Sequence, residues 1–333
     1  MVRLNSCDHP FQLILDNEDR LMGTLTDGDV RRALLRGASL DDDVSECVHK
    51  NYILGQKGNY KGNSELLINS DRSVTFLPVV DEHGKLFEIL INSPKDVRLG
   101  PALIMAGGFG TRLGERTRNI PKPLLPVGGR SILDHVISQL EEAGVETIYV
   151  AVHYLADQII DFINSRKNVA TISMIREDKP LGTAGALGML PNSLTGSILV
   201  VNGDLITGVD YIALHKFHER QGLDATVGVT RYLVDVPFGV VRHGDDGMFT
   251  GIDEKPQISE FVAAGIYYLS SDFLALIPRG VPTDMPDPLN RGCELGMKIG
   301  LFPIHEYWHD VGRPADLKQV DSFIEGKPGS FSS

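Results

Sequence analysis

The sequence predicts an α/β protein whose main domain is a mostly parallel, mixed β-sheet flanked by helices, preceded by a smaller α+β domain. Three observations lead to this prediction. After residue 98, apolar runs typical of buried strands alternate with segments of helical periodicity. A glycine-rich loop directly follows the first of these runs. Before residue 98, one strand–turn–strand pattern occurs twice, so we expect domains at 1–98 and 99–333.

The N-terminal repeat has an offset of 65 residues: 12–16 and 21–26 correspond to 77–81 and 86–91. Each copy reads as two apolar strands joined by an acidic turn, which is the pattern of a β-hairpin. The first copy continues into a helix-like segment at 30–35, with Asp29 placed to cap it.

This repeat resembles a tandem CBS (Bateman) module. In that family a Thr-x-x-Asp pattern contacts the ribose and phosphate of an adenine nucleotide, and the resemblance assigns these contacts to Thr26 and Asp29. The second copy carries Glu88 in place of Gly23 and lacks the Thr-x-x-Asp pattern at 91–94. Two roles therefore stay open for this domain, an adenine-nucleotide sensor and a structural or dimerising appendage.

The main domain begins with the alternation expected of a parallel sheet. The expected strands are at 102–105, 148–152, 171–175 and 197–201, and the expected helices are at 132–143 and around 159–163. Strands that are apolar at consecutive positions are buried on both faces, as in sheets covered by helices. Ligands of such sheets bind beyond the carboxyl ends of the strands.

The glycine-rich loop after the first strand reads Ala106-Gly107-Gly108-Phe109-Gly110-Thr111-Arg112-Leu113. Its three glycines allow the backbone to approach a ligand closely and to direct N–H groups at phosphate. Arg112 offers a fixed fork of donors, and Lys122 offers a point charge between two prolines. The pattern indicates a site for a phosphorylated ligand.

Two other phosphate loops do not fit this segment. A Walker loop ends in Gly-Lys-Ser/Thr, whereas this loop ends in Gly-Thr-Arg. A dinucleotide fingerprint needs a small residue where Leu113 stands. An NAD-dependent oxidoreductase is therefore the weaker interpretation.

The loop and the following Pro121-Lys122-Pro123 resemble the signature of the sugar-1-phosphate nucleotidyltransferases, closest to the mannose-1-phosphate guanylyltransferase-like group that makes GDP-sugars. The resemblance implies the Rossmann-like nucleotide-diphospho-sugar transferase fold. A second loop, 181–186, resembles the family's segment beside the nucleotide base, and Thr183 there is placed to cap the next helix. The nucleotide-binding residues implied are Ala106, Gly107, Gly108, Gly110, Thr111, Arg112, Lys122, Gly182, Thr183 and Asp204.

Two aspartates are candidates for a metal site. Asp204 closes the segment 199–204, in which Gly-Asp ends a strongly apolar strand. An aspartate there is either a helix cap or turn residue or a ligand for Mg²⁺. Asp310 lies in Trp308-His309-Asp310-Val311-Gly312. The family carries its metal carboxylates in matching Gly-Asp and Trp-x-Asp-x-Gly contexts, so the resemblance assigns both residues to Mg²⁺. His309, next to Asp310, is interpreted as a packing residue or as a residue that supports the ligands, and not as a ligand itself.

The resemblance also implies a sugar pocket. It assigns sugar contacts to Gly239 in Phe238–Val241, to Glu254 and Lys255 of the Asp-Glu-Lys-Pro motif, and to Gly265. The family often has Asn where this chain has Ala263, so an amide that could bond a sugar hydroxyl is missing.

The function expected is transfer of a nucleoside monophosphate from an NTP to a hexose or amino-sugar 1-phosphate for bacterial surface glycans, with release of pyrophosphate. GTP is the favoured donor, with UTP and dTTP as rivals. Arg112, Lys122 and Lys255 are the expected catalytic residues. The alternative of another class is a non-catalytic regulatory protein that senses nucleotide sugars.

Composition limits the partners. The 333 residues carry a net charge of −12, with a pI near 5.3, which argues against nucleic acid or an anionic membrane as a partner. Cys7, Cys47 and Cys293 are far apart and odd in number, which indicates reduced thiols of a cytoplasmic protein. We expect a homo-oligomer, either a dimer or a tetramer.

Overall fold

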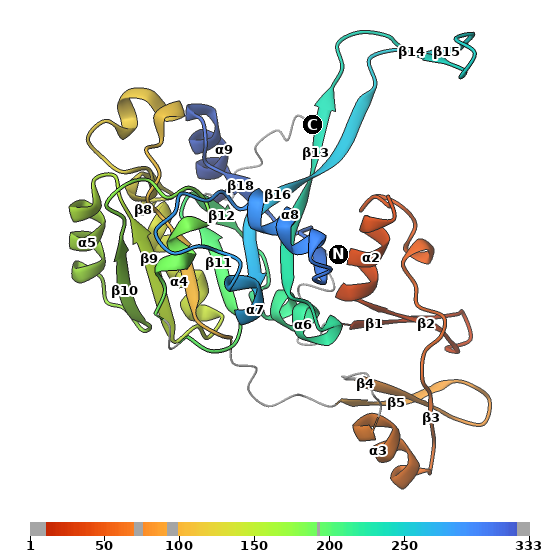
Figure 1. The fold of residues 1–333 in the computed structure, drawn as a ribbon. Coiled ribbons are helices and arrows are strands. Elements are labelled where there is room, and N and C mark those ends of the chain that lie inside the picture. The colour runs from red at the N-terminus through yellow and green to blue at the C-terminus, as the bar shows by residue number, and fades with distance from the viewer. Residues whose placement is uncertain (1–10, 70–75, 92–98, 192–193, 325–333) are drawn as a thin grey trace. The chain divides into compact units, whose positions relative to one another are not determined.

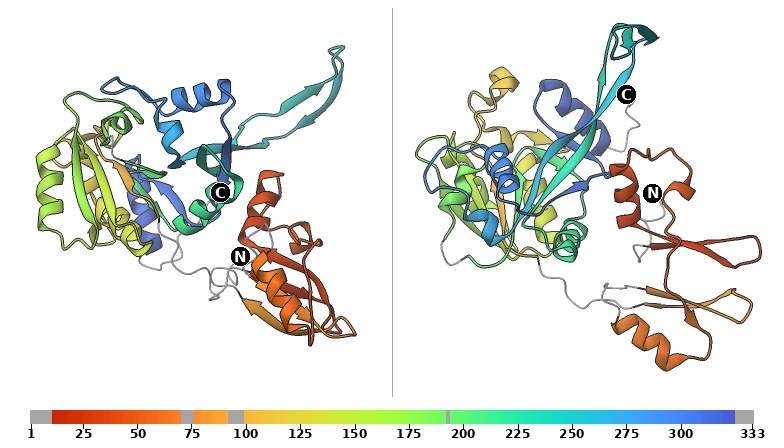
Figure 2. Two further views of the ribbon diagram at one scale, coloured as in Figure 1. Left: turned by 60° about the horizontal axis from the view of Figure 1, so that its bottom comes forward. Right: turned by 45° about the vertical axis from the view of Figure 1, so that its right-hand side comes forward.

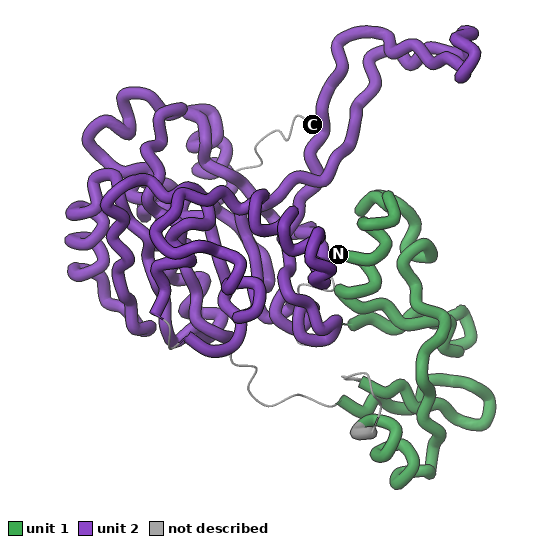
Figure 3. Tube along the Cα trace, in the orientation of Figure 1, with its two compact units in different colours: residues 1–97 green, residues 98–333 purple. Residues whose placement is uncertain are grey.

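The computed structural model describes residues 11–69, 76–91, 99–191 and 194–324. The chain divides into two compact units, residues 1–97 and 98–333 (Figure 3). The expected boundary after residue 98, the end of the second repeat at 92–94 and Cys7 lie outside the described residues.

The N-terminal unit contains two hairpins at the offset expected from the sequence. Strands β1 (Phe11–Leu15) and β2 (Leu21–Thr26) pair antiparallel, as do β4 (Phe76–Val80) and β5 (Leu86–Ile91). The Phe11 and Phe76 rings stack with centroids 3.9 Å apart, so equivalent positions of the two copies meet. The predicted pair of hairpins is confirmed. The other elements of this unit are α2 (Asp27–Leu35), η1 (Val44–Glu46), β3 (Gly55–Gln56) and α3 (Tyr60–Asn69).

The start of helix α2 differs from the expectation. Thr26, not Asp29, is the N-cap, because it has extended dihedral angles and its hydroxyl accepts from the Asp29 N–H at 3.3 Å. Asp29 lies inside the first turn, and its carboxylate accepts in return from the Thr26 N–H at 2.9 Å. The predicted cap at Asp29 is wrong, and the pair forms a capping box.

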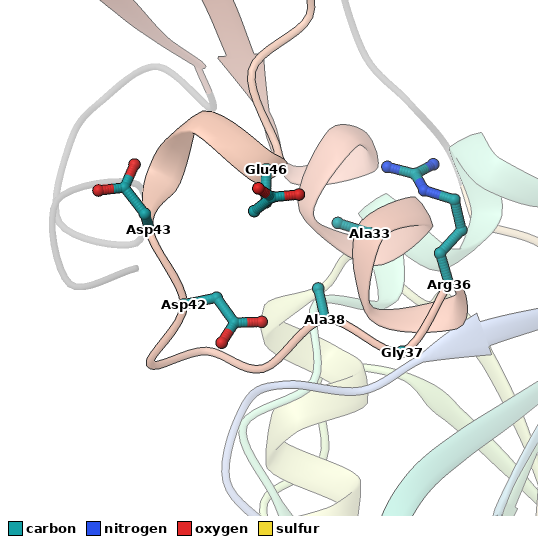
Figure 4. Close-up of a pocket in the computed structure, with 7 residues that line it drawn as sticks. All are labelled: Ala33, Arg36, Gly37, Ala38, Asp42, Asp43 and Glu46. Carbon is teal, nitrogen blue, oxygen red and sulfur yellow. The ribbon is translucent and has the colours of Figure 1, made fainter.

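A cavity of about 530 Å³ lies beside the C-terminal end of α2 in this unit (Figure 4). Its lining includes Arg36 and the acidic side chains of Asp42, Asp43 and Glu46. Asp42 and Asp43 accept hydrogen bonds from the backbone N–H groups of Ser39 and Ser45, so these carboxylates brace the loop.

The second unit is built on a seven-stranded sheet with the order β10-β9-β6-β11-β16-β13-β17 (Figure 1). The first four strands run parallel to one another: β10 (Thr171–Arg176), β9 (Thr147–Val152), β6 (Ala102–Met105) and β11 (Ile198–Asn202). Next come β16 (Gln257–Leu269), antiparallel to both its neighbours, then β13 (Ala225–Asp235) and β17 (Ile299–Pro303), which pair parallel. The predicted mixed, mostly parallel sheet is confirmed.

Alternate side chains of the sheet pack into two separate cores. On one face Ile104 and Val150 pack with helices α4 (Ile132–Glu142), α5 (Ala156–Ser165) and α6 (Tyr211–Gln221). On the other face Leu103 and Ala151 pack with residues of η4 (Gly185–Met189) and around α7 (Ser271–Leu274). Helices on both faces explain why the parallel strands carry no polar face.

A third core lies under the glycine-rich loop. It joins Leu113 to Val311 and to Leu317 of helix α9 (Pro314–Ile324). The short elements of this region are η2 (Thr111–Thr117), η3 (Lys122–Leu124), β7 (Pro126–Val127), β8 (Arg130–Ser131), β12 (Leu205–Thr207) and β18 (Trp308–Asp310). Helix α8 spans Pro286–Glu294.

Strands β13 and β16 continue past the sheet as a two-stranded arm that ends in the hairpin β14 (Val240–His243) and β15 (Phe249–Asp253) (Figures 1 and 2). Strand β17 pairs with β13 only over 225–229, so residues 230–235 of β13 keep one open edge among the described strands. The arm exposes large apolar side chains, with Phe238 at 72% and Phe249 at 67%.

In the part of the chain that the structure describes, no helix has the length and apolarity needed to cross a membrane. Cys47 and Cys293 are free thiols.

Candidate active site

The four parallel strands end at the same edge of the sheet, and residues that follow three of them, β6, β10 and β11, line one pocket. The glycine-rich loop follows β6, Glu177 follows β10, and Asp204 lies two residues after β11. The pocket has a volume of about 250 Å³ and is lined by residues 105–109, 122–123, 177, 180–183 and 202–204. This is the position that the parallel sheet predicted for a ligand.

The two aspartates of the expected metal site lie side by side. Strands β12 and β18 pair antiparallel with Leu205 opposite Asp310, and the Val311 N–H donates to the Asp204 carbonyl at 3.0 Å. The buried Lys122 ammonium donates to Asp204 Oδ2 at 2.5 Å and to Asp310 Oδ1 at 3.3 Å. A small sheet between distant segments therefore builds a cluster of two carboxylates and one cation.

The second oxygen of Asp204 has no protein partner. Asp204 Oδ1 is buried and receives no hydrogen bond from any described residue. Burial raises the pKa of Asp204, and the Asp310 carboxylate raises it further, while Lys122 acts in the opposite direction. An orphaned buried carboxylate oxygen beside a second carboxylate fits the oxygen ligands that Mg²⁺ prefers.

The loop at 181–186 closes one side of the pocket by bonding to a distant segment. The Thr183 N–H donates to Asp284 Oδ1 at 3.0 Å, and Thr183 Oγ1 accepts from the Met285 N–H at 2.8 Å. The prediction that Thr183 caps the following helix is wrong, because its hydroxyl serves this contact and η4 has no side-chain cap. Gly182 has φ +78°, and a Cβ there would lie 2.6 Å from the Asp284 carboxylate.

Sequence reasoning missed two polar residues of the pocket. Glu177 is only 6% exposed, and its Oε2 accepts from the Leu181 N–H at 3.0 Å. Asn202, the last residue of β11, also lines the pocket. Both lie at the carboxyl ends of parallel strands, and that position is the signal that could have found them.

The expected nucleotide-binding residues divide into two groups. Those that line the pocket are Ala106, Gly107, Gly108, Lys122, Gly182, Thr183 and Asp204. Gly110, Thr111 and Arg112 lie outside its lining. Arg112 is close to the acidic cluster, because its guanidinium lies 3.7 Å from the position of a Cβ on Gly312.

The expected sugar-binding residues are placed by the arm and its base. Gly265 has φ +71° at an irregularity in the β13–β16 pairing, where a Cβ would overlap the Asn202 side chain. Gly239 lies against the Glu254 carboxylate, since a Cβ there would be 3.0 Å from Glu254 Oε2. Lys255 has φ +48° between β15 and β16. None of these four residues lines the described pocket.

Fold and site together define an α/β protein with a pocket at the carboxyl edge of its parallel strands, next to a carboxylate pair. The family model described as "Nucleotidyl transferase" matches residues 101–327. The chain belongs to the nucleotidyl transferase family.

Curated relatives are about one-third identical to this chain over the residues that align. The "Bifunctional protein GlmU" of Methanococcus vannielii is 32% identical over 238 residues, which are 67% of this chain and 54% of that protein. The "Mannose-1-phosphate guanyltransferase" of Schizosaccharomyces pombe is 32% identical over 225 residues, which are 65% of this chain and 61% of that protein. The chain thus spans only between half and two-thirds of the length of these relatives.

Among solved structures, HddC from Yersinia pseudotuberculosis is similar at 26% sequence identity and a TM-score of 0.54, covering 68% of this chain and all of that one. A structure of the same protein complexed with GMP-PN gives 25% identity, a TM-score of 0.53 and the same coverage.

Proposed function

We propose that the protein transfers a nucleoside monophosphate from an NTP to a sugar 1-phosphate and releases pyrophosphate. The observation that carries this proposal is the Lys122–Asp204–Asp310 cluster beside a pocket whose wall is the glycine-rich loop. A cation and two carboxylates beside the pocket suit the charge of a transferred phosphoryl group. Family membership supports the same activity.

In this proposal the residues bind and orient rather than react covalently. A sugar phosphate oxygen, already anionic at neutral pH, forms a bond to the α-phosphorus while the bond from that phosphorus to the β-phosphate oxygen breaks. No general base is needed, so in-line positioning and neutralisation of charge supply the catalysis. Lys122 and the loop N–H groups offset charge on the triphosphate, and Arg112 contributes on the side of the departing pyrophosphate.

Asp204 and Asp310 are the residues that would hold Mg²⁺. The ion would withdraw negative charge from the phosphate oxygens it binds. Lys122 bonds to both carboxylates and fixes their separation. This role of Lys122 adds to its expected contact with phosphate.

The acceptor half of the site rests on the Asp253–Pro256 motif and on Gly265. Glu254 would accept from sugar hydroxyls, and Lys255 would hold the sugar phosphate. Gly239 would let the sugar approach the backbone beside Glu254. Since this motif lies outside the pocket lining, the proposal requires the base of the β14–β15 hairpin to contact bound sugar phosphate.

GTP is the proposed nucleotide, with UTP and dTTP as the rival donors. Two findings support guanine: a curated relative named mannose-1-phosphate guanyltransferase and a similar structure complexed with GMP-PN.

Release of pyrophosphate across four NTPs and a panel of hexose and amino-sugar 1-phosphates tests the proposal. Turnover that requires both an NTP and a sugar 1-phosphate is the expected result. Tight binding of a nucleotide sugar without turnover for any pair would instead favour a regulatory sensor.

For the N-terminal unit we propose a CBS pair, supported by the repeated hairpins and the Phe11–Phe76 stack. Thr26 Oγ1 and Asp29 Oδ2 already bond to each other at 2.6 Å, so an adenine nucleotide would have to bind this capped pair as it stands. A shift of the thermal midpoint by AMP or ATP that Thr26→Ala abolishes would support a sensor, and the absence of any shift would favour the structural role.

We also propose that a second copy of the chain covers the arm. Ten of its large apolar side chains are between 37% and 72% exposed. At roughly 170 Å² for each side chain, they offer on the order of 900 Å² of apolar surface. Successive side chains of a strand point to opposite faces, so about half of this surface, on the order of 450 Å², lies on each face of the arm. An apolar patch of that size is as large as the largest patch of a typical monomer, about 300–600 Å², which is often an interaction site. A two-stranded hairpin is also marginally stable alone, so a partner surface would stabilise it.

A further inference from the structure

The outer edge of strand β13 in the arm has no neighbour among the described strands. Strand β17 pairs with β13 only as far as Val229, whose carbonyl accepts from the Ile304 N–H at 2.7 Å. Residues 230–235 pair with β16 on their other side and are exposed from Arg231 onward. The N–H and C=O groups along such an edge are a template for one more strand.

The hydrogen bonds at the two ends of this stretch show which residues direct their backbone groups outward. The N–H and C=O groups of one residue point to the same side of a strand, and successive residues alternate. The Val229 carbonyl points to the β17 side, whereas the Val236 N–H donates at 3.0 Å to a carbonyl on the β16 side. Both bonds place the backbone groups of Arg231, Leu233 and Asp235 at the open edge.

A second copy of the same strand fits this edge best in one antiparallel register. Pairing centred on Leu233 sets this residue opposite itself and sets Arg231 opposite the partner's Asp235. Three pairs of outward-facing residues then meet, and each pair exchanges two hydrogen bonds. Centring the contact one residue earlier or later allows only two such pairs, because β17 occupies the edge up to Val229 and the strand ends at Asp235.

The side chains favour the same register. Opposite charges that face each other across two strands are stabilising, and like charges are destabilising. Pairing centred on Leu233 brings Arg231 opposite the partner's Asp235 at both ends of the contact. Tyr232 then lies opposite the partner's Val234, which is an aromatic and β-branched pair. Charges usually protect an edge strand from association, but two opposite charges four residues apart complement themselves when the strand is reversed.

We propose that two copies of the chain join edge to edge through residues 230–235 of β13, antiparallel and centred on Leu233. The two arms then form one four-stranded sheet across a twofold axis. This inference rests on the proposal that a second copy covers the arm, and it adds the register in which the copies meet. Four strands also give each two-stranded arm the neighbours that it lacks for independent stability.

Charge reversal in the full chain tests this register. Arg231→Asp places two aspartates opposite each other at both ends of the contact, and Asp235→Arg places two arginines there. Each variant should raise the dissociation constant of the contact about 10- to 100-fold in analytical ultracentrifugation, because two pairs change from attraction to repulsion. The control is Arg291→Asp, which reverses an exposed charge on α8 and should leave the dissociation constant unchanged.

Mixing the two variants gives the sharpest result. In an equimolar mixture of Arg231→Asp and Asp235→Arg, one chain carries two aspartates and the other carries two arginines at these positions. The two chains should therefore associate with each other even though neither associates with itself. The double variant R231D/D235R exchanges the charges within one chain and should dimerise like the wild-type protein.

Leu233→Cys gives a readout that does not depend on charge. The Cα atoms of a hydrogen-bonded antiparallel pair are about 5.5 Å apart, which lies within the range of a disulfide, about 4.4–6.8 Å. Mild oxidation should therefore link this variant into a covalent dimer. The wild-type protein and Val169→Cys, at a position exposed elsewhere, should stay largely unlinked.

Unchanged association of Arg231→Asp would overturn the register, as would a mixture that does not restore association or a dimeric Leu233→Cys protein that does not crosslink. If Phe249→Ser separates the copies but the charge variants do not, a second copy covers the arm without pairing along β13. A monomeric wild-type protein would end both proposals. Pyrophosphate release tests the transfer proposal separately from all of these outcomes.

Discussion

The change Asp204→Asn separates the activity of the site from the stability of the fold. It removes one negative charge and keeps the shape of the side chain. In the wild-type protein, Oδ2 accepts from Lys122 at 2.5 Å, while Oδ1 is buried without a partner among the described residues. The amide oxygen can still accept from Lys122, so the pocket wall keeps its contact.

The structure predicts that Asp204→Asn lowers kcat but does not lower the stability of the fold. Loss of one group that stabilises charge in a preorganised site costs about 10²- to 10³-fold in kcat, or about 2.7–4 kcal/mol. In the absence of metal, Asp204→Asn should instead raise the free energy of unfolding. Burial raises the pKa of Asp204 above its ordinary 3.8, and Asp310 adds to this, so the ionised carboxylate opposes folding.

The pH dependence follows from that sign. Because the pKa is raised in the folded protein, the contribution of Asp204 to stability falls as pH rises through the interval above 3.8. At pH 8, in EDTA, Asp204→Asn should therefore unfold at a urea concentration equal to or higher than that of the wild-type protein.

Two assays measure this pair of effects: pyrophosphate release at saturating Mg²⁺, and urea unfolding in EDTA followed by circular dichroism. The control is Asp157→Asn, which changes an exposed aspartate on α5 whose only ion pair among the described residues is a surface one with Arg176. It should leave turnover unchanged and alter the free energy of unfolding by less than about 1 kcal/mol. More than a tenth of wild-type turnover in Asp204→Asn would refute the metal assignment. A large loss of stability would refute the electrostatic argument.

Three further changes probe the acceptor site, an ion pair of helix α4 and the arm. Lys255→Ala should raise KM for the sugar 1-phosphate at least tenfold and leave the dissociation constant of GTP unchanged; a change in GTP binding alone would contradict the sugar assignment. Arg166→Met removes the cation that bonds to Glu141 at 2.8 Å and should lower the free energy of unfolding by about 3 kcal/mol. Burial raises the pKa of Glu141, but the Arg166 hydrogen bond and two backbone N–H groups hold that pKa below 4.5. The loss of stability in Arg166→Met, measured by urea unfolding, should therefore become smaller as pH falls below 4.5. A loss that grew at lower pH would contradict the ion-pair argument. Phe249→Ser on the arm should shift the mass measured by light scattering toward the monomer, whereas Val169→Ser, exposed elsewhere, should not; equal masses for both would remove the arm from the interface.

The parts of the fold that the sequence predicted are those specified by local patterns. Strand β6 is apolar at every position and is followed at once by glycines, so both the buried strand and the turn could be read from a few adjacent residues. The two N-terminal hairpins carry the same pattern twice, which located both. The cap at Asp29 was wrong because Thr26 ends strand β2 and can cap from there, which depends on where the strand stops.

The composition of the site depends on contacts between distant segments. Asp204 and Asp310 meet because β12 pairs with β18, and no local pattern specifies that pairing; the family resemblance supplied it. Thr183 bonds to Asp284 and Met285, about a hundred residues away, so its expected local cap did not form. Glu177 was missed because only the assembled sheet shows that it lies at the edge where the parallel strands end.

The central claim is that this site moves a nucleoside monophosphate onto a sugar phosphate. The most direct measurement incubates the protein with Mg²⁺, mannose 1-phosphate and GTP labelled at the α-phosphorus, then separates the products. The account predicts label in a nucleotide sugar, one pyrophosphate released for each molecule formed, and no release without the sugar phosphate. Folded protein that transfers no label from any of the four NTPs to any sugar 1-phosphate tested would contradict it.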